Sequence, residues 1–311
     1  MDKATLYIVI PCYNEEKMLP IAKDMFLDKL ESLMFSKKIS YNSKILFVND
    51  GSKDNTWKLI KSFADETDEI VGISQSKNRG QQSSLVAGLM EVKDKCDIAI
   101  TMDCDGQDDI DAIDRMIDAY YGGCEVVYGV RDSRDTDTFF KRNSALLFYK
   151  LMNLMGTPVI YNHAEYRLMS SKVLKSFSDF KEVNIFLRGL FPLIGFKSTC
   201  VYYTRKEREA GESHYPFNKM LNLALDGITS FSSVPLRLIF MSGVFLFLVS
   251  IIFMIISLVL YGKVSIPEVI FFVGSLNLTA LGIIAEYIAK IYMEVKHRPV
   301  FIIEEKTENL N

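Results

Sequence analysis

The chain has 311 residues, of which 49% are apolar, and this is enough for a sizeable hydrophobic core in one large or two smaller domains. The formal net charge of -3 excludes a general attraction to nucleic acid, so no nucleic-acid partner is expected and an anionic ligand must be bound by a local group of Lys and Arg. Five cysteines without a CxxC pair argue against a metal or disulfide role, and we expect them to be unpaired in a reducing compartment.

Short apolar runs rich in β-branched residues alternate with helical patterns through the first half of the chain. Strands are expected over residues 6–11, 44–50, 70–74, 98–103 and 125–130, and helices over 15–34, 55–64, 81–92 and 110–121. This alternation predicts an α/β domain with a mostly parallel sheet. Ligands of such sheets bind beyond the carboxyl ends of the strands, where this chain has polar residues. They are Asn14, Glu15, Asp50, Lys77, Asn78, Asp103, Asp105 and Arg131.

The fourth expected strand runs into a group of carboxylates, in the stretch ITMDCDGQDD over residues 100–109. Like charges at this spacing repel unless a cation or a proton lies among them. Asp103 and Asp105 are therefore predicted to face a hard divalent cation, Mg²⁺ or Mn²⁺, and Gln107 to add a carbonyl ligand or orient a water molecule. For Asp108 and Asp109, the start of the next helix is an equally good explanation.

A metal held by only two carboxylates usually brings a phosphorylated ligand with it. The glycine-rich signatures GxGxxG and GxxxxGK[ST] are absent, so metal and side chains must hold the phosphates. Asp50, in VNDGSKDNT, is expected to accept a hydrogen bond from a base or ribose. The alternative is a turn before a helix that Asp54 or Asn55 caps.

The last third of the chain has the pattern of a membrane hairpin. Residues 238–260 form an uncharged run long enough to cross a hydrocarbon core of ~30 Å, and residues 269–285 form a second, slightly more polar span. Lys and Arg flank the outer ends of the two spans, whereas the connecting turn holds only Lys263. This distribution predicts a two-span protein of the cell membrane with its catalytic domain and both termini in the cytoplasm.

Amphipathic helices are expected over residues 139–155 and over residues 216–233, directly before the first span. The second of these is interpreted as a helix on the bilayer surface, with an ordinary core-packing helix as the alternative. The domains then run over residues 1–215, 216–235, 236–290 and 291–311, and the terminal EEKTENLN is expected to fray.

The ordered set of motifs resembles the family 2 inverting glycosyltransferases of the polyprenyl-phosphate type, typified by dolichol phosphate mannose synthase and bactoprenol glucosyltransferases. The resemblance covers nearly the whole chain. The matching pieces are IVIPCYNEE, FVNDGSKDNT, NRGQQSSLVAGL, MDCDGQDD, GVRDSR, YRLM, REAGESHYP and the two spans. Two pieces depart from the family pattern: Gln81 replaces a common Lys, and NHAEYRLM, around residues 162–167, replaces a more acidic, glycine-containing version.

The resemblance implies a GT-A fold, a nucleotide-diphosphate sugar donor and a polyprenyl phosphate acceptor at the membrane. The donor residues it implies are Pro11, Tyr13, Glu15, Asp50, Asn78, Arg205, Arg208, Ser213 and Tyr215. The residues it places at the acceptor phosphate are Arg131, Arg134, Lys141 and Arg142, and the metal ligands are Asp103, Asp105 and Gln107. Relatives with two C-terminal spans tend to self-associate, so a homo-oligomer is expected.

The expected reaction moves a hexose, with glucose or N-acetylglucosamine favoured and a UDP-linked donor preferred, to an undecaprenyl-type phosphate used in cell-envelope glycan modification. Asp105 and Arg131 are the expected catalytic residues, because two anions must be brought together and the departing diphosphate stabilised. The alternatives are a haloacid-dehalogenase-like phosphatase and a catalytically idle membrane anchor subunit. The phosphatase signature requires Ser or Thr at the position of Gln107. A third alternative, a processive polysaccharide synthase, would need more membrane spans and a QxxRW motif, and neither is found in the sequence.

Overall fold

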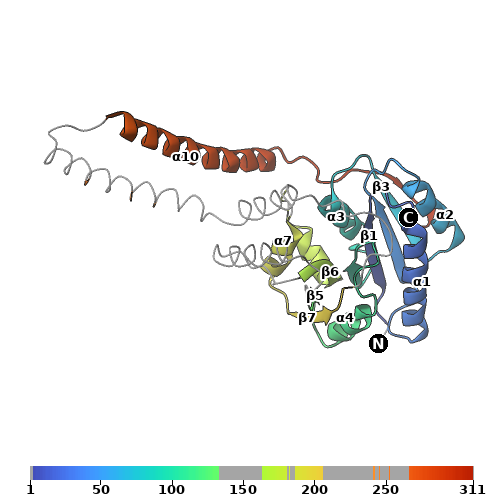
Figure 1. The fold of residues 1–311 in the computed structure, drawn as a ribbon. Coiled ribbons are helices and arrows are strands. Elements are labelled where there is room, and N and C mark those ends of the chain that lie inside the picture. The colour runs from blue at the N-terminus through green and yellow to red at the C-terminus, as the bar shows by residue number, and fades with distance from the viewer. Residues whose placement is uncertain are drawn as a thin grey trace.

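A computed structural model describes residues 3–132, 163–180, 182, 186–205, 241, 245, 252 and 266–310. One eight-stranded sheet forms its centre, in the order β7-β5-β6-β4-β1-β2-β3-β8 (Figure 1). The strands are β1 (Leu6–Cys12), β2 (Lys44–Asn49), β3 (Ile70–Gln75), β4 (Ile98–Thr101), β5 (Val126–Arg131), β6 (His163–Ser170), β7 (Ser198–Tyr203) and β8 (Ile303–Lys306). The described helices are α1 (Leu19–Phe35), α2 (Thr56–Glu66), α3 (Gln81–Val92), α4 (Ala112–Tyr121), α6 (Ser171–Phe177), α7 (Leu187–Ile194) and α10 (Ile266–Val295), and the short 3-10 helix η1 covers Glu308–Leu310.

The mostly parallel α/β sheet expected from the sequence is confirmed. β4, β1, β2 and β3 pair in parallel, and β5 pairs in parallel with β7. β6 and β8 are the two antiparallel strands, β6 lying between β4 and β5 and β8 lying along β3. All five predicted strands are present, and the predicted helix 81–92 coincides with α3. α1 begins later than expected, because residues 16–18 form a turn.

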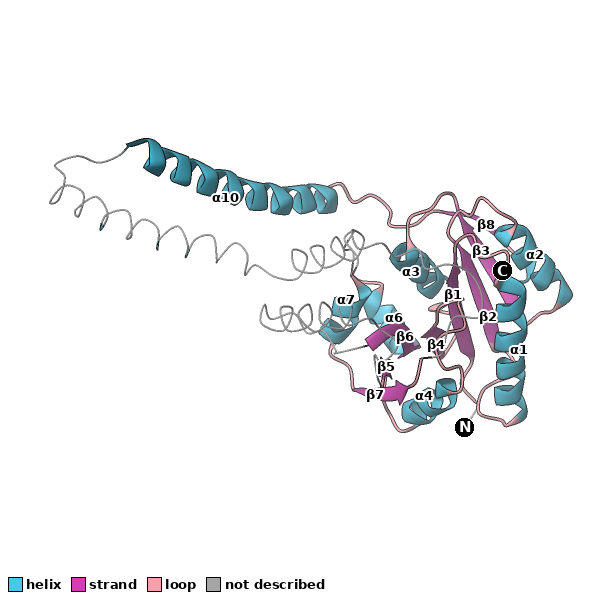
Figure 2. Ribbon diagram, viewed as in Figure 1, coloured by secondary structure: helices cyan, strands magenta, loops and turns pink. Residues whose placement is uncertain are grey.

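Successive side chains of β1 point into two separate cores, as the period of a strand requires. Leu6, Ile8 and Ile10 pack with α1, α2 and α4, while Tyr7 and Val9 pack with α3, α6 and α7. The sheet is therefore covered on both faces, and helices lie on either side of it in the ribbon (Figure 2). Burial on both faces explains why the parallel strands read as continuous apolar runs.

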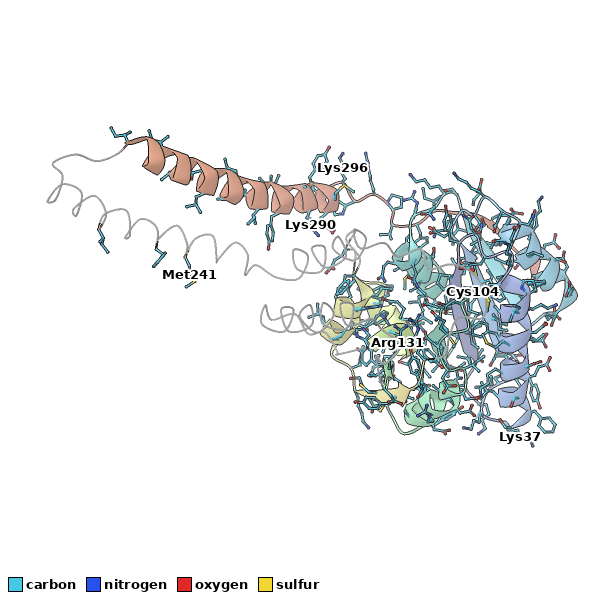
Figure 3. The ribbon with its side chains drawn as sticks, viewed as in Figure 1. Lys37, Cys104, Arg131, Met241, Lys290 and Lys296 are labelled. Carbon is cyan, nitrogen blue, oxygen red and sulfur yellow. The ribbon has the colours of Figure 1, made fainter. Side chains whose placement is uncertain are left out.

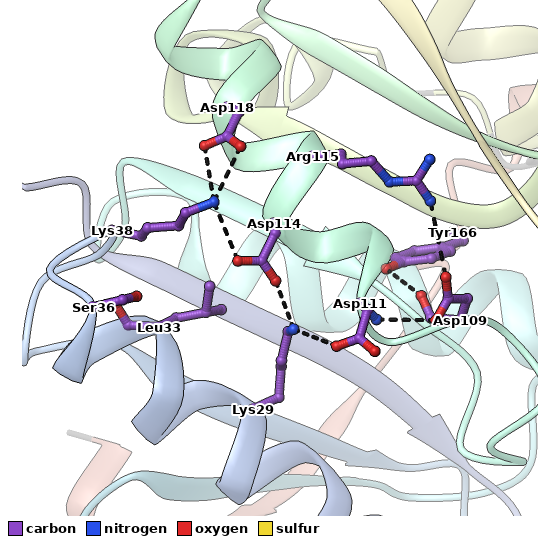
Figure 4. A network of polar contacts seen from close by, with 10 residues as sticks. All are labelled: Lys29, Leu33, Ser36, Lys38, Asp109, Asp111, Asp114, Arg115, Asp118 and Tyr166. Carbon is purple, nitrogen blue, oxygen red and sulfur yellow. Dashed lines mark hydrogen bonds and ion pairs between the residues drawn. The ribbon is translucent and has the colours of Figure 1, made fainter.

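An ion network on the protein surface joins α1 to α4 (Figure 4). Lys29 Nζ lies 2.6 Å from carboxylate oxygens of both Asp111 and Asp114, and Lys38 Nζ lies 3.2 Å from Asp114 and 3.1 Å from Asp118. Exposed pairs of this kind contribute little stability each, roughly 0–1 kcal/mol. The network orients α4, which follows directly on the acidic segment 103–109.

The expectation of a frayed C-terminus is wrong. β8 adds to the edge strand β3, with Ile73 opposite Lys306 and Ser74 opposite Glu305. Beyond it, the Thr307 hydroxyl accepts a hydrogen bond from Gly72 N at 2.9 Å, and the buried Leu310 joins the core on the α3 side. The polar composition of the tail does not predict this role, because the tail pairs with β3 mainly through backbone groups along an exposed sheet edge.

The helix α10 has 30 residues and extends away from the sheet (Figure 1). Lys290 and Lys296 lie at its end nearer the sheet (Figure 3). Within the described part of the chain, no helix is long and apolar enough to cross a membrane. The predicted helices 139–155 and 216–233 lie outside the described residues, as does the first predicted span except for Met241, Phe245 and Ile252.

Candidate active site

The loop after β1 is hydrogen-bonded to the loop after β2. Asn14 N donates to Ser52 Oγ at 3.0 Å, Lys53 N donates back to Asn14 Oδ1 at 2.9 Å, and Glu15 N donates to Thr56 Oγ1 at 2.9 Å. Asn14 adopts a left-handed backbone with φ of 54°, a conformation that Asn tolerates better than most residues. Pro11, Tyr13 and Glu15 are thereby held at the carboxyl edge of the sheet, where the donor was predicted.

Asp50 lies buried at the end of β2 and holds the β3–α3 loop. Its carboxylate accepts hydrogen bonds from Arg79 N and Gly80 N, each at 2.9 Å, and from Gln75 Nε2 at 3.0 Å. Burial raises the pKa of Asp50 although the two backbone N–H groups oppose the shift. The turn after Asp50 requires glycine, because Gly51 has φ of 62° and a Cβ there would lie 2.5 Å from the Lys77 carbonyl carbon. Asn78 lies exposed in the same loop.

The acidic segment after β4 brings together three of the predicted metal ligands. Asp103 Oδ1 accepts a hydrogen bond from Gln81 Nε2 at 2.6 Å, and Asp105 Oδ1 accepts one from Gln107 N at 3.1 Å. Arg205 Nη2 donates to Gln107 Oε1 at 2.5 Å and lies 3.8 Å from Asp105 Oδ2. The structure thus places Arg205, assigned to the donor by resemblance alone, directly against this segment.

The electrostatics of the segment fit a divalent cation. Burial and the neighbouring charges of Asp108 and Asp105 raise the pKa of Asp103 to about 7, which marks a local excess of negative charge. No group of three or more His, Cys, Asp and Glu residues placed to hold a metal occurs in the described ranges. Asp103, Asp105 and Gln107 carry hard oxygen ligands of the type that Mg²⁺ or Mn²⁺ prefers, and their role in holding a cation stays a prediction.

Asp108 contacts Tyr203 and Arg131, whereas Asp109 lies in the turn that precedes α4. Asp108 is buried, and its Oδ1 accepts a hydrogen bond from Tyr203 at 2.7 Å and lies 3.3 Å from Arg131 Nη2. Asp109 Oδ1 instead accepts from Asp111 N at 3.2 Å, as expected of a residue at a helix start. The sequence alone does not distinguish Asp108 from Asp109, whereas the structure gives the two carboxylates different partners.

Tyr203 is a site residue that the sequence did not reveal. It lies opposite Arg131 in the parallel pair of β5 and β7. Burial and the charge of Asp108 raise the pKa of Tyr203, so its hydroxyl remains protonated and donates. Burial lowers the pKa of the Arg131 guanidinium, but Asp108, Tyr203 and Asp103 together outweigh burial and raise that pKa above its ordinary value. Nothing in the local pattern of β7 indicates this role, since only strand pairing brings the two residues together.

A second buried ionic cluster, centred on Glu165, adjoins the end of β4. Glu165 forms an ion pair with Arg167, and its Oε1 accepts from Arg188 Nε at 2.8 Å and from Gln82 Nε2 at 3.0 Å. Burial alone would raise the pKa of Glu165, but the charges of Arg167 and Arg188 lower it to about 2. The cluster occupies the segment that departs from the family pattern, and it leaves Glu165 as a permanent carboxylate.

Several predicted site residues lie outside the described residues. They are Arg134, Lys141, Arg142, Arg208, Ser213 and Tyr215. Their roles at the acceptor phosphate and the donor stay predictions. The five cysteines are free, as expected, and Cys12 and Cys104 are buried beside the site.

Comparison with known proteins identifies two family models along the chain. Residues 7–177 match the model of glycosyl transferase family 2, and residues 234–291 match the model of the GtrB C-terminal hairpin. The first match includes β1 to β6 and every predicted residue of the acidic segment. The second coincides with the two segments predicted to form a hairpin.

The similarity to known proteins covers almost the full length of the chain. YkoT of Bacillus subtilis, described as an uncharacterized glycosyltransferase, is 45% identical over 310 residues, which cover 97% of this chain and 92% of YkoT. The bactoprenol glucosyl transferase of Shigella phage SfV is 36% identical over 310 residues, covering 97% of this chain and 98% of the phage protein. These matches leave the phosphatase hypothesis without support. The mixed, mostly parallel sheet is that of the GT-A fold, and the chain belongs to glycosyl transferase family 2.

Proposed function

We propose that this glycosyltransferase moves glucose from UDP-glucose to a polyprenyl phosphate of undecaprenyl type at the cytoplasmic face of the membrane. The observation that carries the proposal is the convergence of Asp103, Asp105, Arg205 and Arg131 at the carboxyl edge of the sheet. Acidic ligands for a cation and two guanidinium groups suit a reaction between two phosphorylated substrates. Similarity to bactoprenol glucosyl transferases over most of the chain supports the choice of sugar and acceptor.

On the donor side, Asp103, Asp105 and Gln107 would hold a divalent cation, which supplies charge stabilisation for the departing nucleoside diphosphate. Arg205 contacts Gln107 and is placed to pair with the same diphosphate. Asp50 keeps the β3–α3 loop in shape beside the nucleotide. Pro11, Tyr13, Glu15 and Asn78 complete the proposed donor surface.

On the acceptor side, a polyprenyl phosphate oxygen is already anionic near neutral pH, so a strong general base is less necessary than for a sugar hydroxyl. Arg131, held by Asp108, would neutralise the acceptor phosphate, and Asp105 would orient the acceptor or the sugar. Attack in line with the departing diphosphate inverts the anomeric configuration. Arg134, Lys141 and Arg142 are proposed to extend the cationic surface for the acceptor.

The acceptor has a long apolar tail and presents its phosphate only at the bilayer surface, so the site must lie close to a membrane. We propose two membrane spans within residues 236–290, with the sheet domain and both termini in the cytoplasm. The match of residues 234–291 to a C-terminal hairpin family supports this arrangement. A homo-oligomer assembled through the hairpin is part of the proposal.

The test uses the purified full chain with Mg²⁺ or Mn²⁺, undecaprenyl phosphate and radiolabelled UDP-glucose, UDP-N-acetylglucosamine or GDP-mannose. We expect a lipid-extractable product from UDP-glucose and no product after chelation of the metal. Label from UDP-N-acetylglucosamine alone would correct the sugar, and label from GDP-mannose alone would correct the base. Absence of product with every donor would contradict the proposal.

A further inference from the structure

The chain that leaves α10 returns to the sheet across the start of α3 (Figure 2). Arg79 Nη1 donates a hydrogen bond to Pro299 O at 3.1 Å, and Ser83 Oγ lies 2.9 Å from Val300 O. Ser76 N then donates to Ile302 O at 3.1 Å, directly before the pairing of β8 with β3 begins. We name residues 299–302 the strap.

The strap is connected to Asp50 through buried polar side chains. Ser83 Oγ lies 3.2 Å from Gln75 Oε1 as well as close to Val300 O, and its single proton is shared between these two acceptors. Gln75 Nε2 donates to Asp50 Oδ1 at 3.0 Å and to Ser84 Oγ at 2.7 Å. All four side chains of this connection are buried: Asp50, Gln75, Ser83 and Ser84. Loss of one of these hydrogen bonds therefore costs free energy, because water does not readily replace the lost partner.

The loop between β3 and α3 is thus fixed from two sides. On the inner side, Asp50 binds Arg79 N and Gly80 N. On the outer side, the strap carbonyls bind the side chains of Arg79 and Ser83. The same loop leads into Gln81, whose amide contacts Asp103, so its shape affects both the nucleotide surface and the acidic segment.

We propose that the strap is a positioning element of the donor site, which ties the β3–α3 loop to the end of the proposed membrane hairpin. The inference rests on the proposed function for its reference to a donor, while the coupling between strap and loop is independent of it. Because the strap continues α10 after only a few residues, the end of the hairpin and the nucleotide surface are held in one arrangement.

Protection of the sheet edge is the competing explanation, because an uncovered β3 would invite pairing with other chains. Edge protection is made by β8 and the residues after it, whose exposed contacts include Trp57 Nε1 to Glu305 Oε2 at 2.6 Å and Lys61 Nζ to Glu305 Oε1 at 3.0 Å. The strap contacts to Arg79 and Ser83 lie beyond that edge and are not needed to cover it. Variants can therefore separate the two roles.

The experiment measures hydrogen exchange of the loop amides in the full chain, together with the KM for the donor. In Ser83→Ala, we expect the amides of Arg79 and Gly80 to exchange about fivefold faster, and the donor KM to rise by a similar factor with kcat nearly unchanged, as loss of about one hydrogen bond implies. Glu305→Gln is the matched control, because it weakens the exposed edge contacts and leaves the strap in place. It should leave both values at the parental level.

A second variant removes the other side-chain contact to the strap and leaves the edge contacts of β8 in place. Arg79→Met removes the donor to Pro299 O and should speed exchange of the same two amides in the same direction. Parental exchange and parental donor KM in both folded variants would overturn the proposal, and so would an equal effect of Glu305→Gln. Faster loop exchange in a protein that transfers no sugar would reject the proposed function while leaving the coupling of strap and loop intact.

Discussion

The hydroxyl of Tyr203 donates to Asp108 Oδ1 at 2.7 Å, and Arg131 lies 3.3 Å from the same oxygen. One buried carboxylate thereby fixes two groups from neighbouring strands, because Tyr203 and Arg131 are paired in register between β7 and β5. Arg131, the residue proposed to bind the acceptor phosphate, is held in place by Asp108 of the acidic segment. This relationship links the proposed donor and acceptor sides of the site.

Tyr203→Phe removes one of these bonds and keeps the ring. We expect the free energy of unfolding to fall by about 2 kcal/mol, because a buried carboxylate loses a donor, and kcat/KM to fall roughly tenfold as Arg131 gains freedom. Chemical denaturation and transfer kinetics measure the two effects. Tyr202→Phe, at the exposed neighbouring position, is the control and should behave as the parent. Parental kinetics in Tyr203→Phe would contradict a role for this bond in holding Arg131.

Asp103→Asn and Asp105→Asn should each lower kcat at least about 10³-fold, the effect expected when a ligand of the ion that stabilises a leaving group is lost. Binding of Mn²⁺ in the presence of UDP, followed by electron paramagnetic resonance, should weaken in both variants. Asp109→Asn changes a carboxylate in the same segment that serves the helix start, and it should retain most activity. A loss in Asp109→Asn equal to that in Asp103→Asn would argue for a general charge effect instead of a metal site.

The fold could be predicted from the sequence as far as local pattern and strand order reach. Apolar runs identified β1 to β5, and the polar residues at their ends proved to converge, because the carboxyl ends of parallel strands share one edge. Tyr203, Glu165 and the strap were not found for a common reason. Each acts through a contact between segments far apart in the chain, such as β7 with β5 or β8 with β3, and periodicity contains no information on such pairing.

Asp50→Asn tests how the β3–α3 loop is held. The substitution keeps the shape of the side chain but turns one acceptor toward Arg79 N or Gly80 N into an N–H donor. We expect the KM for the donor to rise at least roughly tenfold, with a smaller change in kcat, because the loss concerns the shape of a binding surface. Asp68→Asn, on the exposed surface, is the control. An unchanged donor KM would show that Asp50 serves neither the loop nor the nucleotide.

Glu165→Gln should destabilise the protein strongly, because the buried Arg167 donates to Glu165 through Nη2, while its Nε and Nη1 have no hydrogen-bond partner among the described residues. The expected loss is about 3–5 kcal/mol, typical of breaking a buried ion pair on one side. Glu66→Gln, at an exposed pair with Lys23, should change stability little.

The effect of Glu165 should depend on pH with a defined sign. Arg167 and Arg188 hold its pKa at about 2, below the value of about 4.3 for an unfolded glutamate. The carboxylate therefore contributes its full stability above the unfolded pKa and loses it as the pH falls toward the folded pKa. Urea denaturation at pH 7 and at pH 3 should show a large difference between parent and Glu165→Gln at the higher pH and a smaller one at the lower. A difference that grows on acidification would contradict a charged Glu165, and would instead indicate that a protonated carboxyl bridges the two arginines.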